Sequence, residues 1–122
     1  MKQIKLLVKA DTRKYPIIIG HNLTKKISNI INKNSINFKK CFLVVDKNVP
    51  KKLISNIRKS LKNYKIFIYF FNANEKNKNF KSVNNILKIL LKNNFSREDC
   101  LISVGGGITG DVSGFAASLF KR

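Results

Sequence analysis

Residues that commonly hold metal ions are scarce in this sequence. It contains one histidine, His21, and six acidic residues in 122. Its two cysteines, Cys41 and Cys100, each begin an apolar run and show no CxxC or Cys/His spacing. A metal site needs several convergent ligands. The pattern therefore predicts no metal site, a surface position for His21, and two buried, reduced thiols without a chemical role.

Long apolar runs are also missing. No continuous apolar run approaches the roughly 18 residues of a membrane-spanning helix. The first residues, MKQIKLLVKA, place lysines between apolar residues and lack the apolar core and cleavage site of a signal peptide. We therefore expect a cytoplasmic protein without membrane contact. The length favours one domain with its own core, although it is short for an enzyme whose cleft needs two walls.

The shortage of acidic residues leaves a formal charge of +19. A domain this basic is often a nucleic-acid-binding domain. The lysines, however, are spread through every segment, accompany many Asn and Ile residues, and are joined by only four arginines. This composition is typical of A/T-rich codon usage, so nucleic acid is not the expected partner. A basic nucleic-acid-binding module remains the alternative from outside the enzymes.

Strand-like and helix-like segments alternate along the chain. Two β-rich runs, residues 3–10 and 15–20, flank a turn-like segment, which predicts an N-terminal hairpin. Short continuous apolar runs then predict buried parallel strands, and apolar residues at helical spacing predict helices between them. The strands cover 41–46, 65–71 and 100–104, and the helices cover 22–34, 49–61 with Pro50 in the first turn, 80–91 and 112–119. The order predicts an α/β fold with a Rossmann-like, mostly parallel sheet.

Three of the six acidic residues follow predicted strands. Asp46 ends one strand, Glu75 follows the next, and Asp111 follows the last. Ligands of open α/β sheets bind at the carboxyl ends of the strands. We therefore expect these three carboxylates to converge on one edge of the sheet.

The same edge carries a glycine-rich turn. Residues Gly105, Gly107 and Gly110 satisfy GxGxxG after a strand and before a helix, where backbone N–H groups can contact a pyrophosphate. In the usual dinucleotide-binding fingerprint, the glycines lie in the first βα turn and the acidic residue follows them in the sequence. Here the glycines follow the last predicted strand, and the strand-end residues Asp46 and Glu75 precede them. The pattern predicts a dinucleotide in a non-standard register. The alternative is a tight turn in which Gly114 and Ala117 make a close helix contact.

The segment SVGGGITGDVSGFAASLFKR, residues 103–122, resembles the glycine-rich signature of 3-dehydroquinate synthase. YPIIIG resembles the opening hairpin of that family, VVDKNV its nucleotide-side strand end, and FSREDCLISVGGG its approach to the glycines. The family's Glu-x-x-Lys loop, counted back from the glycines, falls on Glu75 and Lys78. The acid-glycine pair that precedes this loop in the family is replaced by Ala73 and Asn74.

This resemblance implies that residues 1–122 form an incomplete N-terminal NAD-binding domain, truncated before a helical, metal-binding second domain. It implies a phosphate-eliminating carbon-oxygen lyase of the shikimate pathway of aromatic amino acid biosynthesis. Such an enzyme converts 3-deoxy-D-arabino-heptulosonate 7-phosphate to 3-dehydroquinate, and uses and returns NAD. The family's zinc or cobalt ligands, one Glu and two His, have no counterpart in this chain. We therefore expect a sugar-phosphate substrate, a homodimer when full length, and no synthase activity from this chain alone.

The resemblance also assigns site residues. Its cofactor contacts match Asp46 and Asn48 toward the adenosine ribose, Glu75 and Lys78 in the following loop, and Gly106, Gly107, Ile108, Thr109, Gly110 and Asp111 around the pyrophosphate and nicotinamide. Arg122 matches an arginine that reaches the substrate in the neighbouring subunit. The family's main catalytic groups have no counterpart in this chain. Other sugar-phosphate cyclases and glycerol-dehydrogenase-like enzymes share the nucleotide domain and remain the alternatives among enzymes.

Overall fold

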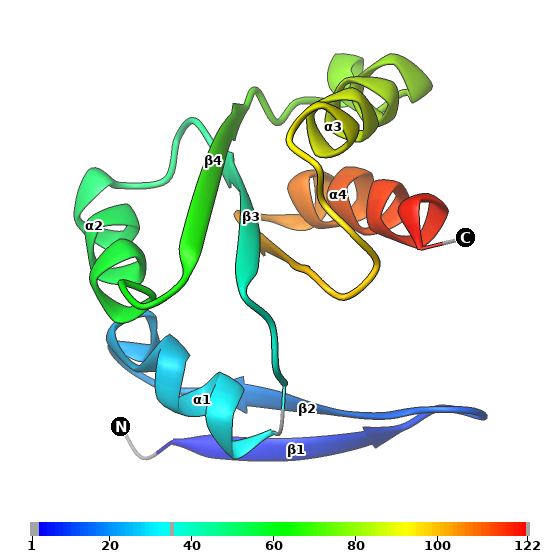
Figure 1. The fold of residues 1–122 in the computed structure, drawn as a ribbon. Coiled ribbons are helices and arrows are strands. Elements are labelled where there is room, and N and C mark those ends of the chain that lie inside the picture. Colours follow the sequence, from blue (N-terminus) through cyan, green and yellow to red (C-terminus); the bar gives the residue numbers. More distant parts are fainter. Residues whose placement is uncertain (1–2, 35, 122) are drawn as a thin grey trace.

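The computed structural model describes residues 3–34 and 36–121. Figure 1 shows a hairpin below a small sheet that has helices on both faces. The strands are β1 (Ile4–Lys9), β2 (Lys14–Ile19), β3 (Lys40–Asp46), β4 (Lys65–Phe71) and β5 (Cys100–Val104). The α-helices are α1 (Ile27–Lys33), α2 (Lys51–Ser60), α3 (Phe80–Lys92) and α4 (Gly107–Phe120), and short 3-10 turns cover Leu23–Lys26 and Glu75–Asn77.

The structure confirms the predicted α/β fold and corrects three helix starts. The first α-helix begins at Ile27 rather than near Asn22, because Leu23–Lys26 form a 3-10 turn. Pro50 is the N-cap of α2 and does not lie in its first turn. The α4 helix begins at Gly107 rather than near Val112, so the last glycine of the triplet is already helical. The apolar spacing could not show this, because the first turn of α4 is rich in small residues.

The main sheet has three parallel strands in the order β4-β3-β5, and the antiparallel hairpin forms a separate sheet. Residues Cys41 to Val45 of the central strand are all buried. Neighbouring strands cover both edges of β3 and helices cover both of its faces, which explains why its sequence is a continuous apolar run.

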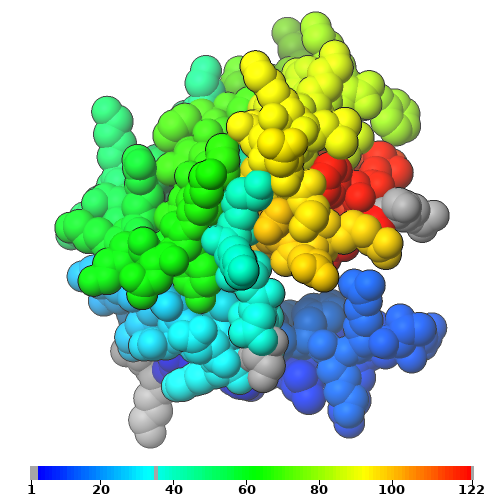
Figure 2. Space-filling view, in the orientation of Figure 1, coloured from blue at the N-terminus to red at the C-terminus, as the bar shows by residue number. Residues whose placement is uncertain are grey.

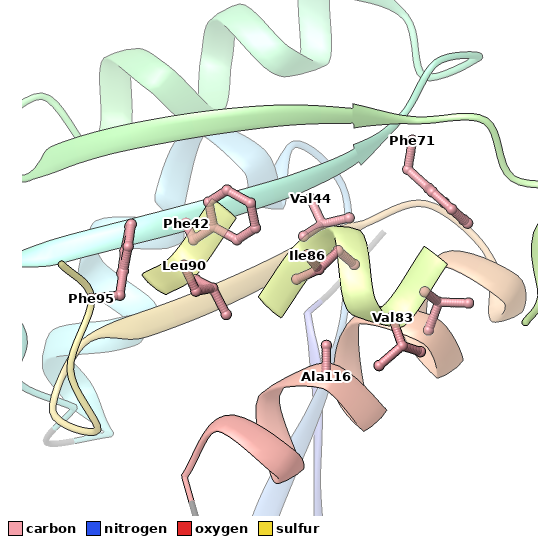
Figure 3. Close-up of a cluster of buried hydrophobic side chains, with 9 residues drawn as sticks. Phe42, Val44, Phe71, Val83, Ile86, Leu90, Phe95 and Ala116 are labelled. Carbon is pink, nitrogen blue, oxygen red and sulfur yellow. The ribbon is translucent and has the colours of Figure 1, made fainter. Parts of the chain in front are cut away.

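Alternate residues of β3 serve two separate cores. Phe42 and Val44 pack with residues of α3 and α4, as Figure 3 shows for Ile86, Leu90 and Ala116. The opposite face joins Cys41, Leu43 and Val45 to Ile31, Ile54, Ile57 and Leu61 from the α1 and α2 side. This two-sided burial fixes the register of β3, since a slip by one residue would exchange the two faces.

Successive strands are added to the sheet on opposite sides of β3. From β3 the chain runs through α2 to β4 on one side, and then through α3 to β5 on the other side of β3. The helices that follow β3 and β5 therefore cover opposite faces (Figure 1). This arrangement opens a crevice at the carboxyl ends of the two strands, where open α/β sheets bind ligands.

The hairpin leaves much apolar surface uncovered. In Figure 2 it forms the blue lower part of the molecule. The exposed apolar residues of its strands are Ile4, Leu6, Leu7, Tyr15, Ile17 and Ile19. All of these except Leu7 share one face of the hairpin, and an apolar face of this kind is typical of a contact with further protein. Among the described residues, no helix combines the length and apolarity needed to cross a membrane.

Candidate functional site

The N-terminus of α4 presents unpaired backbone donors at the crevice. Its N-cap, Gly106, has no side-chain cap, and the first intrahelical bond in this turn runs from the Gly110 N–H to the Gly106 carbonyl at 3.1 Å. The preceding N–H groups have no partner within the helix. A Cβ atom built at Gly106, Gly107 or Gly110 would meet no atom within 4 Å. The turn is therefore open for an anionic group such as a phosphate.

Gly105 follows β5 directly and brings the glycine-rich turn into contact with the end of β3. Its φ of +153° is one that other residues rarely adopt, and a Cβ built on it would lie 2.8 Å from Thr109 Oγ1 and 2.9 Å from Asp46 Cβ. Only glycine permits this approach. The motif GxGxxG contains Gly105, but the resemblance left it out of the site residues. Its role depends on a contact with Asp46, which lies far away in the sequence.

Asp46 lies at the carboxyl end of β3 and is half-buried. Its Oδ1 accepts a hydrogen bond from the Asn48 N–H at 3.0 Å, which fixes the carboxylate at the start of the loop. The Lys47 N–H donates to the Phe71 carbonyl at 3.0 Å and ties this loop to the end of β4. The second carboxylate oxygen has no protein donor among the described residues, so it can accept from ligand hydroxyls.

Thr109 is more deeply buried than its neighbours in the glycine-rich turn. The residue is completely buried, and its Oγ1 has no hydrogen-bond partner among the described residues. Its side chain lies against Gly105, below the surface of the turn. The structure therefore gives Thr109 a packing position, whereas Gly106, Gly107 and Gly110 are exposed and Ile108 is half-buried.

A second group of predicted site residues meets around an ion pair. Lys78 Nζ lies 3.0 Å from Asp111 Oδ2, with both side chains about half-exposed. The hydrogen bond and charge of Asp111 raise the pKa of Lys78, and Glu75 adds a smaller effect in the same direction. Glu75, Lys78 and Asp111 are thus close neighbours, although Lys78 and Asp111 belong to different segments.

Asparagine side chains hold the loop that carries Glu75 and Lys78. Asn74 Oδ1 accepts from the Asn77 N–H at 3.0 Å, and Asn77 Nδ2 donates to the Asn72 carbonyl at 2.8 Å. Asn74 is one of the two residues that replace the family's acid-glycine pair. These bonds fix a 3-10 turn directly before α3 and give the altered loop a defined shape.

An apolar pocket of about 350 Å³ opens beside the ion pair, between the N-terminal halves of α3 and α4. Lys78 and Asp111 lie at its polar rim, and Phe80 and Phe115 form an exposed aromatic wall with ring centroids 6.1 Å apart. The site therefore combines backbone donors, carboxylates, one cation and an apolar surface.

Other sequence predictions have mixed outcomes. Arg122 lies outside the described residues. His21 is exposed and lies before the first 3-10 turn. In ranges 3–34 and 36–121, no three His, Cys, Asp or Glu side chains form a group that could hold a metal.

The alternative in which Gly114 makes a close helix contact is wrong, because a Cβ there would meet nothing within 4 Å.

Comparisons with known proteins identify the family. A family profile described as "3-dehydroquinate synthase N-terminal" matches residues 68–122. The whole chain is 58% identical over 122 residues to 3-dehydroquinate synthase of Pelagibacter ubique (strain HTCC1062), of which it covers 33%. The chain belongs to the 3-dehydroquinate synthase family. A second synthase, from Staphylococcus haemolyticus (strain JCSC1435), is 35% identical over 88% of the chain and 29% of its own length.

The chain spans about a third of the length of these 3-dehydroquinate synthases. The fold agrees with a solved structure of 2-deoxy-scyllo-inosose synthase in complex with carbaglucose-6-phosphate, NAD+ and Co2+. The TM-score is 0.83 at 21% identity, and the match covers 96% of this chain and 32% of the other. At 21% identity this likeness shows the fold of the chain alone.

Proposed function

We propose that this chain is the N-terminal NAD-binding part of a cytoplasmic 3-dehydroquinate synthase. The supporting observation is the junction at Gly105, where the Asp46 end of β3 and the open N-terminus of α4 come together. A carboxylate for ribose hydroxyls then lies next to N–H donors for a pyrophosphate, as dinucleotide sites of α/β sheets require. The solved 2-deoxy-scyllo-inosose synthase of the same fold contains NAD+, which supports NAD as the dinucleotide.

In this proposal, each group has a chemical task. Asp46 and Asn48 hold the adenosine ribose, while the backbone N–H groups of Gly106, Gly107 and Ile108 hold the pyrophosphate. Gly110, whose N–H is bonded to the Gly106 carbonyl, lets the pyrophosphate approach because it has no side chain. Glu75, Lys78 and Asp111 lie toward the nicotinamide side, and the buried Thr109 positions the turn. When bound, NAD supplies reversible hydride transfer to and from the substrate. The residues of this chain bind and orient the cofactor. By the family resemblance, Arg122 reaches the sugar phosphate in the neighbouring subunit of the dimer.

The metal of the family does not fit the residues of this chain. The described ranges hold no cluster of three metal-ligating side chains, and a catalytic metal needs several convergent ligands. We therefore assign the metal to the part of the enzyme that lies beyond this domain. With NAD, zinc or cobalt and 3-deoxy-D-arabino-heptulosonate 7-phosphate, the purified chain should release no phosphate. Measurable turnover would contradict the proposed division of labour.

We also propose a homodimer for the full-length enzyme. The exposed apolar residues on one face of the hairpin, such as Leu6, Tyr15 and Ile17, supply surface that further protein can cover. Sedimentation of the full-length enzyme should give a dimer. A monomer at micromolar concentration would contradict this part of the proposal.

The cofactor proposal can be tested with one matched pair of variants. Asp46→Asn removes the charged acceptor at the end of β3, and Asp11→Asn removes the same charge from an exposed position in the hairpin turn. Charged hydrogen bonds contribute about 1.5–3 kcal/mol, so Asp46→Asn should weaken NAD binding roughly tenfold to hundredfold. Asp11→Asn should bind NAD like the wild type. Isothermal titration calorimetry measures the difference.

Two outcomes would count against the cofactor proposal. One is a chain that is folded by circular dichroism but binds no NAD at millimolar concentration. The other is equal NAD affinity for the two variants. Salt-dependent binding of DNA or RNA without NAD binding would instead favour the basic binding module.

A further inference from the structure

Cys41 and Cys100 are direct neighbours on two parallel strands. They pair in register at the amino-terminal ends of β3 and β5, and both contact the apolar cluster on the α1 and α2 side of the sheet. Adjacent strands lie about 4.8 Å apart, and a disulfide can join residues whose Cα atoms are about 4.4–6.8 Å apart. Both residues are free thiols in the structure. Their register therefore places the two thiols next to each other, and a disulfide requires their Cβ atoms to approach to about 3.5–4.5 Å.

The two thiols differ in access. Cys41 is fully buried, as the sequence predicted. Cys100 is only half-buried, which corrects the sequence prediction, and it lines a pocket of about 290 Å³ with residues of α4 and of the loop before β5. The pocket gives a small reagent access to Cys100, whereas Cys41 is fully buried and does not line the pocket. The pocket lies at the opposite end of the sheet from the candidate nucleotide site.

The environment also separates their acidities. A hydrogen bond between the two thiols lowers the pKa of Cys100 against the effect of partial burial, and the positive charge of Lys121 contributes in the same direction. The same hydrogen bond and deeper burial raise the pKa of Cys41. Cys100 therefore ionises first, and a thiolate is the form that attacks a disulfide.

We propose that Cys100 and Cys41 form a redox-active dithiol that reacts with small disulfides of the glutathione class. The Cys100 thiolate attacks one sulfur of the small disulfide, whose S–S bond breaks and releases one small thiolate. That thiolate takes the proton of Cys41, and the Cys41 sulfur then attacks Cys100 and displaces the second small thiolate. Two protein thiols lose two electrons in total, and one small disulfide becomes two thiols.

The test follows thiols by mass after the 122-residue chain reacts with glutathione disulfide. Wild-type chain should lose two hydrogen atoms and give a linked peptide pair that contains Cys41 and Cys100. Cys41→Ser should instead retain one glutathione on Cys100, because the second thiol is missing. Cys100→Ser should stay unmodified, because Cys41 is inaccessible.

A measurement on the wild type alone covers the case in which a variant fails to fold. The internal disulfide should form at least about tenfold faster in native buffer than in denaturant, because the sheet holds the two thiols side by side. Equal rates in the two conditions would overturn the proposal. So would two intact thiols in the native chain, or glutathione attached to Cys41 in folded Cys100→Ser.

Discussion

Replacing Gly105 with alanine tests whether the contact between β3 and α4 shapes this site. The new Cβ would lie 2.8 Å from Thr109 Oγ1, 2.9 Å from Asp46 Cβ and 3.1 Å from Thr109 Cβ. None of these is the free end of a flexible side chain, so the strand end and the helix must separate. The substitution also forces a side chain onto a backbone with φ of +153°.

The expected cost can be estimated from these two effects. The unfavourable backbone conformation costs about 1–3 kcal/mol, and overpacking at a tight contact costs about 1–3 kcal/mol. Gly105→Ala should therefore lower the free energy of unfolding by about 2–6 kcal/mol. A domain has only about 5–15 kcal/mol in total. With a mid-range urea m-value of about 2 kcal/mol/M, the midpoint should fall by roughly 1–3 M.

Gly114→Ala is the matched control. Gly114 lies on the exposed side of the same helix, and a Cβ there meets nothing within 4 Å. Alanine should stabilise the helix by about 1 kcal/mol. Urea unfolding followed by circular dichroism measures both variants. If Gly105→Ala unfolds at the wild-type midpoint while the control behaves as expected, the contact does not have the assigned role.

Two further predictions concern charged side chains. Lys40 Nζ donates to the Asn93 and Asn94 carbonyls at 2.8 and 2.9 Å, so Lys40→Met should cost about 1–2 kcal/mol in urea unfolding. The exposed Lys39→Met should change little, and equal effects would refute the role given to Lys40. Because Asp111 raises the pKa of Lys78, the ion pair stabilises the fold below about pH 10.5, and this contribution is lost as the pH rises through the higher folded-state value. Asp111→Asn should therefore shift the NMR titration of Lys78 to lower pH, and an unchanged titration would show that the two side chains do not pair in solution.

The sequence by itself determined the secondary structure and the type of site. Continuous apolar runs and helical spacing are local signals, and they located every strand and α-helix of the described chain, with errors in the starts of α1, α2 and α4. The run of glycines between a strand and a helix indicated an anion site for the same local reason. The glycine signature also carried the family resemblance, which the 58% identical relative confirms.

Only the tertiary structure decided which distant residues meet. The strand order β4-β3-β5 brings Gly105 against Asp46 and Cys100 beside Cys41. The packing of α3 against α4 creates the apolar pocket, and the loop before α3 places Lys78 on Asp111. Strand order and register result from the burial of two opposite cores around β3, a cooperative property of the whole fold. No short segment of the sequence contains that information.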